Sequence, residues 1–139
     1  MRGIYETISD RQRQKDFADK IARTWLCEVV ETARAARIDY LCLREKALAA
    51  LLEIKTRSIS SEKFSDSIIG LDKWLTGWRM SKDLRVPFML AIRFSDRDMF
   101  ANVSEVDSVR LAISGRTDRG DPLDIAPQVY IPLANFKSF

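Results

Sequence analysis

Histidine is absent from the 139-residue chain, and its absence excludes several kinds of active site. Without an imidazole the chain has no Ser-His-Asp triad, no Cys-His pair and no zinc site with histidine ligands. Any general acid or base is therefore Asp, Glu, Lys, Tyr or water. A bound metal ion would take mostly oxygen ligands, which points to Mg²⁺ or Mn²⁺.

Cysteine is scarce too, and long apolar runs are missing. The only cysteines, Cys27 and Cys42, lie in short apolar segments, so we interpret them as buried free thiols. The longest uncharged stretch is too short and too mixed to span a bilayer, and the first twenty residues lack the apolar core of a signal peptide. These absences predict a protein of the cytoplasm with no membrane association.

Proline and glycine are few, and all four prolines fall in the second half of the chain. No Pro/Gly-rich linker, internal repeat or low-complexity tract divides the sequence, and its length fits one domain, residues 1–139. The proline-free first half favours helix at its start. The second half has the turn residues and short apolar runs that are typical of strands.

Apolar spacing predicts two helices. Phe17, Ile21 and Trp25 recur at intervals of four and predict a helix over residues 11–34. After the serine-rich segment 58–61, a second helix is predicted from a stripe at helical spacing, formed by Phe64, Ile68, Leu71, Leu75 and Trp78.

The remaining apolar segments predict strands. Residues 38–43 and 47–56 are expected to pair across a turn at the charged segment 44–46. Further strands are expected over 86–94, 99–103, 109–114 and 128–131. The order helix, two strands, helix and several strands predicts an α/β fold, with a mixed β-sheet and flanking helices.

Charged residues gather on the two paired strands. Residues two apart in a strand point to the same face, so Glu53 and Lys55 project together while Ile54 turns into the core. If the two strands pair, Asp39 reaches the same corner. Two carboxylates and one lysine then converge at one end of the hairpin.

These side chains suit phosphodiester hydrolysis. Asp39 and Glu53 would hold Mg²⁺ or Mn²⁺, and the carbonyl of Ile54 is a candidate further oxygen ligand. The ion would bind a phosphate oxygen and lower the pKa of an attacking water. Lys55 would stabilise the developing negative charge or orient the water. An acid-x-lysine triplet alone, however, is more often a solvated strand face than a site.

The spacing of these residues resembles the signature of the restriction-endonuclease-like PD-(D/E)XK phosphodiesterase superfamily. The match consists of Asp39 followed by the segment 53–57, Glu-Ile-Lys-Thr-Arg, and residues 71–74, 86–94 and 115–121 are similar to small phage-encoded members. The resemblance covers about residues 16–135. It implies the restriction-endonuclease-like core, Mg²⁺- or Mn²⁺-dependent hydrolysis of DNA and, since cutting two strands needs two sites, a homodimer.

The first helix of the superfamily often supplies a further acid. The resemblance carries that role to Glu28, with Glu31 as the alternative. On the wheel of the predicted helix, Glu28 falls amid the apolar face, where an unpaired carboxylate is costly. The chain departs from the family in two respects. No proline precedes Asp39, and residues 35–37 leave almost no room for the strand that usually follows this helix. Either the helix ends early, or that strand is missing and another replaces it.

Candidate contacts to nucleic acid are the basic residues Arg57, Lys73, Arg116 and Arg119. The resemblance allows Lys73 to face the site. The helical wheel instead places it opposite the apolar stripe, as a solvated lysine.

Two functions remain open. The first is a metal-dependent DNA nuclease, phage-encoded, acting in recombination, repair or genome processing in the host cytoplasm. The second is a catalytically inactive protein of the same fold that binds DNA or modulates a host protein. The net charge of +3 permits a polyanionic partner without demanding one.

Overall fold

The computed structural model describes residues 8–33, 36–106, 108–115, 120–122 and 125–139. Its element bounds run in chain order as follows: α1 (Ile8–Trp25), β1 (Glu28–Glu31), β2 (Tyr40–Arg44), β3 (Ala47–Thr56), β4 (Asp66–Gly70), α2 (Leu71–Leu84), β5 (Phe88–Arg93), β6 (Asp98–Asn102), β7 (Arg110–Ser114), β8 (Ala126–Pro132), the 3-10 helix η2 (Leu133–Asn135) and β9 (Lys137–Ser138). No helix in the described part of the chain has the length and apolar character that crossing a membrane requires.

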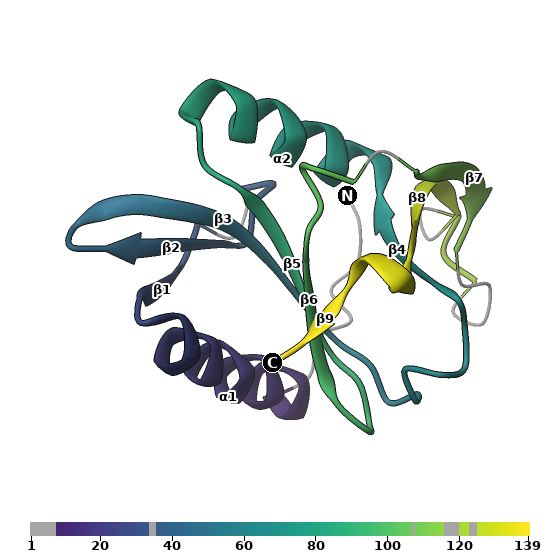
Figure 1. Cartoon of the computed structure of the whole chain (residues 1–139). Coiled ribbons are helices and arrows are strands. Elements are labelled where there is room, and N and C mark those ends of the chain that lie inside the picture. The colour runs from purple at the N-terminus through teal and green to yellow at the C-terminus, as the bar shows by residue number, and fades with distance from the viewer. Residues whose placement is uncertain (1–7, 34–35, 107, 116–119, 123–124) are drawn as a thin grey trace.

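The strands form two sheets (Figure 1). The larger sheet has the order β1-β2-β3-β5-β6-β9 and the smaller one the order β4-β8-β7. Pairing between β3 and β5 is parallel, whereas the neighbouring pairs β2–β3 and β5–β6 are antiparallel. The sheet is therefore mixed and flanked by helices, as predicted. A parallel pair needs a crossover connection, which β4 and α2 supply here.

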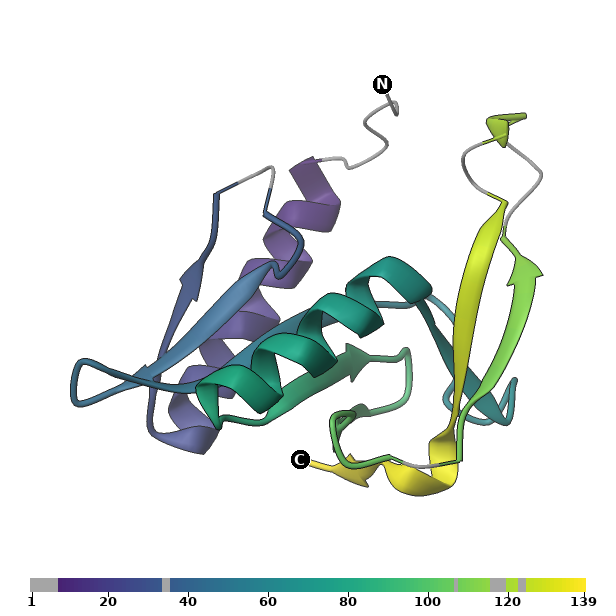
Figure 2. The same cartoon turned by 90° about the horizontal axis from the view of Figure 1, so that it is seen from above.

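The two helices cover opposite faces of the larger sheet (Figures 1 and 2). On one face, Phe17 and Ile21 of α1 pack with buried side chains of β2 and β3, including Leu52 and Ile54. On the other face, α2 and the smaller sheet cover a second cluster built around Leu51, Phe88, Leu90, Ile69 and Val129. The central strand β3 thus contributes alternate residues to two separate cores.

Helix α1 is shorter than predicted. It ends at Trp25 instead of continuing to residue 34, because Leu26 adopts a left-handed conformation with φ 53°. The amide of Cys27 then donates to the carbonyl of Ala22, which closes the helix end. Strand β1 follows and pairs with β2, so the strand that seemed to have no room is present.

The prediction of the second helix was wrong for its N-terminal part. Phe64 lies in a loop and Ile68 lies in β4, and α2 begins only at Leu71. Ile68 and the fully buried Ile69 pair with β8, more than fifty residues further along the chain. That long-range pairing overrides the local helical spacing, because it buries strand residues that a lone helix would leave exposed.

The predicted hairpin of β2 and β3 is confirmed. Its turn residues Glu45 and Lys46 both have positive φ angles, 51° and 64°, as the two central residues of a type I′ hairpin turn do. The predicted strands over 86–94, 99–103, 109–114 and 128–131 correspond to β5, β6, β7 and β8. Both cysteines are free thiols; Cys42 is buried as predicted, whereas Cys27 is only partly buried.

Candidate active site

Strand β3 presents its charged residues to the α2 face of the sheet. Ile54 belongs to the core under α1, and Leu51 belongs to the core under α2. Successive side chains of a strand alternate between faces, so Glu53 and Lys55 share the face of Leu51. The structure therefore has the arrangement that the sequence predicted for residues 53–55.

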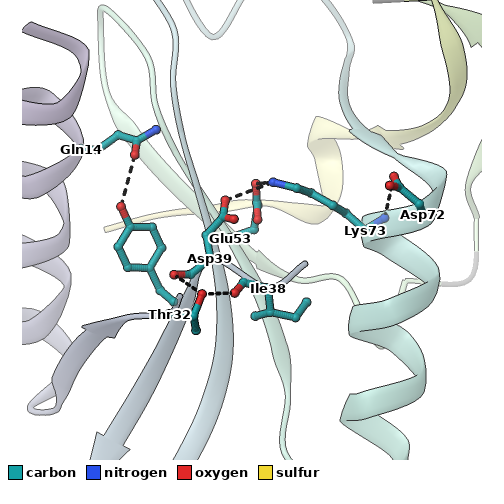
Figure 3. Close-up of polar contacts among 8 residues, drawn as sticks. Gln14, Thr32, Ile38, Asp39, Glu53, Asp72 and Lys73 are labelled. Atoms are coloured by element: carbon teal, nitrogen blue, oxygen red, sulfur yellow. Dashed lines mark hydrogen bonds and ion pairs between the residues drawn. The ribbon is translucent and has the colours of Figure 1, made fainter. Parts of the chain in front are cut away.

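Asp39 lies directly before β2, beside Glu53. Tyr40 is paired with Leu52, so continuing the antiparallel register by one residue brings Asp39 opposite Glu53. Thr32 fixes the backbone there, because its amide donates to the Asp39 carbonyl over 2.9 Å and its hydroxyl donates to the carbonyls of Ile38 and Asp39. Figure 3 shows the two carboxylates side by side.

Lys73 completes the cluster from the first turn of α2 (Figure 3). Its Nζ donates to Glu53 Oε1 over 2.9 Å and to Asp39 Oδ2 over 3.1 Å. The helical wheel had placed Lys73 in solvent, and that interpretation was wrong because the buried face of α2 runs through Gly77 and Ser81, whereas Leu75 and Trp78 of the apolar stripe are exposed. The family likeness, which allowed this lysine to face the site, was the better guide.

Burial controls the charges in this cluster, which we call the Asp39–Glu53–Lys73 cluster. Glu53 is only 4% exposed, and burial raises its pKa to about 7, with the nearby Asp39 carboxylate raising it further against the opposing effect of Lys73. Burial disfavours the charge on Lys73, but Glu53 and Asp39 outweigh burial and raise its pKa. Lys73 is therefore a firmly charged ammonium between two carboxyl groups.

Lys55 has the opposite tendency. Burial lowers its pKa to about 8, and the neighbouring charge of Arg57 lowers it too. Both residues share the face of Glu53, since the amide of Arg57 continues the pairing of β3 with β5 by donating to the carbonyl of Arg93. Glu53, Lys55 and Arg57 thus form a row, with neighbours roughly 6.6 Å apart along the strand.

The cluster fits a divalent cation. Glu53 Oε2 is buried and has no hydrogen-bond partner among the described residues, although a buried carboxylate oxygen normally has one. The backbone amides of Leu51 and Arg57 both donate to the β5 side of β3. Backbone groups alternate between the two sides of a strand, so the carbonyl of Ile54 points to the other side, towards β2. The pairing of β2 with β3 ends there, at Tyr40. Asp39, Glu53 and the Ile54 carbonyl are the oxygen donors of this corner.

A third acid does not join them in the part of the chain that the structure describes. The prediction of Glu28 as a helix acid was wrong, since Glu28 begins β1 and is paired with Leu43. Leu43 is four residues along β2 from Asp39, about 13 Å away. The alternative, Glu31, is exposed and lies opposite Tyr40. From α1, it is the amide of Gln14 that approaches this end of the hairpin, accepting a hydrogen bond from the Tyr40 hydroxyl.

The remaining predicted contacts to nucleic acid are only partly placed. Arg57 directly follows β3 in the row described above. Arg116 and Arg119 lie outside the described residues.

Comparisons with known proteins agree with this fold. The structure is similar to that of Archaeoglobus fulgidus Hjc, a Holliday junction resolvase from an archaeal hyperthermophile, with a TM-score of 0.53 and 11% sequence identity over 88% of this chain and 84% of that one. At this identity the likeness shows the fold, which is the predicted restriction-endonuclease-like core. No curated protein matches the sequence. A family model described as "Phage putative PDDEXK endonuclease" matches residues 1–139, so the chain belongs to this family of phage nucleases.

Proposed function

We propose that the chain is a divalent-metal-dependent deoxyribonuclease that hydrolyses phosphodiester bonds at the Asp39–Glu53–Lys73 cluster. The observation that carries the proposal is the buried Oε2 atom of Glu53, which has no hydrogen-bond partner within the described ranges although Glu53 adjoins a second carboxylate. Membership of a phage endonuclease family supports the same conclusion. Asp39, Glu53 and the Ile54 carbonyl would hold Mg²⁺ or Mn²⁺, which when bound supplies charge for the scissile phosphate and lowers the pKa of a coordinated water.

Lys55 is the residue we assign to the reacting phosphate. It extends from the same strand face as Glu53, two residues further towards the end of β3. Its pKa of about 8 leaves it mostly protonated at neutral pH, yet able to exchange a proton with a water molecule. An ammonium held in this partly buried position stabilises the charge that develops on the phosphoryl oxygens.

Lys73 has a different task. In the metal-free protein its ammonium neutralises Asp39 and Glu53 and keeps the two carboxyl groups together. A divalent ion would take over this neutralising role, which leaves Lys73 available for a phosphate oxygen. Lys73 thereby preserves the geometry of the acidic pair before the metal binds.

Cleavage assays test the proposal. Purified protein is incubated with supercoiled, linear and branched DNA in Mg²⁺, Mn²⁺ or EDTA, and cleavage is expected only with metal. Asp39→Asn and Glu53→Gln should abolish cleavage. Glu28→Gln is the matched control, since it makes the same chemical change on an exposed residue outside the cluster. Folded wild type that cleaves none of these substrates, or Glu53→Gln that cleaves at the wild-type rate, would refute the proposal.

Lys55→Met distinguishes a residue that acts on the phosphate from the residues that hold the metal. We expect it to lower kcat by about 10²- to 10³-fold, as the loss of a donor to the transition state does. Affinity for Mn²⁺, measured by calorimetry, should remain unchanged. An equal loss of metal affinity would contradict the role assigned to Lys55.

A binding-only role is the second candidate. It is favoured by the pair of acids without a third in the described chain and by Lys73 already neutralising that pair. Calorimetry discriminates, because absence of Mn²⁺ binding at millimolar metal together with retained DNA binding would favour this candidate. The expected homodimer is also a proposal, which light scattering of the purified protein tests.

A further inference from the structure

A second site lies where the row Glu53, Lys55 and Arg57 ends. Arg57 lines a pocket of about 480 Å³, a volume in the range of small-molecule sites. The loop after β3 and the strands β4 and β8 form its walls. The Asp39–Glu53–Lys73 cluster and this pocket therefore share one strand face, with Lys55 between them.

Aromatic side chains form part of the apolar lining of this Arg57 pocket, beside aliphatic ones such as Ile59 and Leu133. Phe64 lines the pocket with a ring that is 60% exposed, and the Lys63 ammonium lies 5.6 Å from the centroid of this ring. The guanidinium of Arg110 lies over the ring of Tyr130, 4.2 Å from its centroid. The Tyr130 hydroxyl donates to the Ser114 hydroxyl, so the polar end of this tyrosine is already satisfied within the protein. The pocket thus offers flat surfaces suited to stacking.

Polar groups of both kinds line the same pocket. Arg57 and Arg110 are donors, Asp66 is an acceptor, and Ser60 and other serines can be either. Arg110 is oriented by an ion pair with Asp66, with 3.3 Å between Nη2 and Oδ2. A site for phosphate alone would not contain a carboxylate, and a site for an apolar ligand would not contain two guanidinium groups. Stacking surfaces combined with mixed donors and acceptors are the chemistry that recognises a nucleobase.

We propose that the Arg57 pocket binds one unpaired nucleobase of the DNA strand whose phosphate lies at the Asp39–Glu53–Lys73 cluster. The inference rests on the proposed action on DNA and adds a substrate class to it. Arg57 contacts the backbone between the two sites, Phe64 stacks on the base, and Asp66 and Arg110 bond to its edge. A base inside a duplex cannot reach this pocket, so the enzyme prefers DNA with an extrahelical or single-stranded nucleotide beside the scissile bond.

Binding measurements without cleavage test this preference. Fluorescence anisotropy in EDTA compares a labelled duplex that has a single-nucleotide bulge with the same duplex fully paired. Wild type should bind the bulged DNA more tightly. Phe64→Ala should lower the affinity for bulged DNA about fivefold or more, the smallest effect expected for loss of one base–aromatic stack, and leave paired DNA unchanged.

Ile113→Ala is the matched control, because Ile113 is an equally apolar, 76% exposed residue on β7 that does not line the pocket. A bulge that carries 2-aminopurine adds a direct readout, since stacking on Phe64 quenches its fluorescence in wild type only. Equal affinity for both DNAs, or an equal loss for both in Phe64→Ala, would overturn the base pocket and leave the nuclease proposal standing. Failure to bind either DNA in EDTA would also overturn the base pocket, whereas the nuclease proposal is tested separately by cleavage in the presence of metal.

Discussion

Replacing Lys73 with methionine removes the ammonium between Asp39 and Glu53 while keeping an apolar stem of similar length. In the folded protein Lys73 Nζ is 2.9 Å from Glu53 Oε1 and 3.1 Å from Asp39 Oδ2. Glu53 is nearly inaccessible, so water cannot replace the lost hydrogen bond. The variant therefore keeps two adjacent carboxyl groups, one of them buried, without the ammonium that hydrogen-bonds to both.

The expected loss of stability is smaller than for a buried charge that cannot be neutralised. Removing one partner of a buried ion pair costs about 3–5 kcal/mol when the other must stay ionised. Here the Lys73 side chain is 35% exposed, and Glu53 can escape by taking up a proton because its pKa is already about 7. We therefore expect the free energy of unfolding at pH 7 to fall by about 1–2 kcal/mol.

The cost also depends on pH. The pKa of Glu53 is raised from 4.5 to about 7 by folding, so its contribution to wild-type stability is lost as the pH rises through this window and is constant above it. Without Lys73, which lowers the pKa of Glu53, that pKa rises further. The variant should then keep losing stability above pH 7, by up to about 1.4 kcal/mol per pH unit relative to wild type.

Urea unfolding in EDTA at pH 6, 7 and 8, followed by tryptophan fluorescence, measures this difference. Lys82→Met is the control on the same helix, since Lys82 is exposed and its ammonium lies over the ring of Trp78, 5.4 Å from the centroid. That control should lose about 1 kcal/mol or less at every pH. A loss in Lys73→Met that is the same at pH 6 and pH 8, or no larger than that of Lys82→Met, would refute the reasoning.

Three other measurements test separate parts of the structure. Glu53→Gln should gain stability relative to wild type as the pH rises from 5 to 7, because it removes the raised pKa; unfolding curves that stay parallel would assign no such role to Glu53. Gly77→Ala should cost about 1–3 kcal/mol although alanine favours helix, since its Cβ would lie 2.2 Å from the buried ring of Phe88; an unchanged melting temperature would contradict this close packing. Iodoacetamide at pH 8 should label Cys27 well before Cys42, because burial raises the pKa of the Cys42 thiol to about 12. Peptide mass spectrometry measures the order of labelling, and labelling of Cys42 first would be inconsistent with the fold.

The sequence predicted the hairpin and its charged residues because both are local features. Alternation in residues 47–56 separates Ile54 from Glu53 and Lys55, and the short turn before β3 brings Asp39 opposite Glu53. The end of α1 was missed because the left-handed residue there is Leu26, and this conformation is usually signalled by glycine or asparagine. Glu28 was misassigned as a consequence of that missed helix end.

The contribution of Lys73 depends on contacts that no local pattern contains. Its position follows from the parallel pairing of β3 with β5 and from the approach of α2 to the sheet, where Gly77 lies against Phe88. The Arg57 pocket is equally non-local, since Arg57, Asp66 and Tyr130 come from three parts of the chain. Sequence reasoning identified the strand that carries the site, and tertiary structure supplied the residues that surround it.

The packing of β3 also fixes the strand register that positions the site residues during folding. Its buried apolar residues alternate with Glu53 and Lys55, and both faces of the sheet are covered. A slip of one residue in pairing would turn both charged side chains into the core under α1 and expose Ile54 towards α2. A molecule with this shifted register would lose much of its stability. Chains with a misplaced Glu53 would therefore unfold and refold, and would not accumulate as inactive protein. The packing of β3 therefore selects the strand register that places Glu53 beside Asp39.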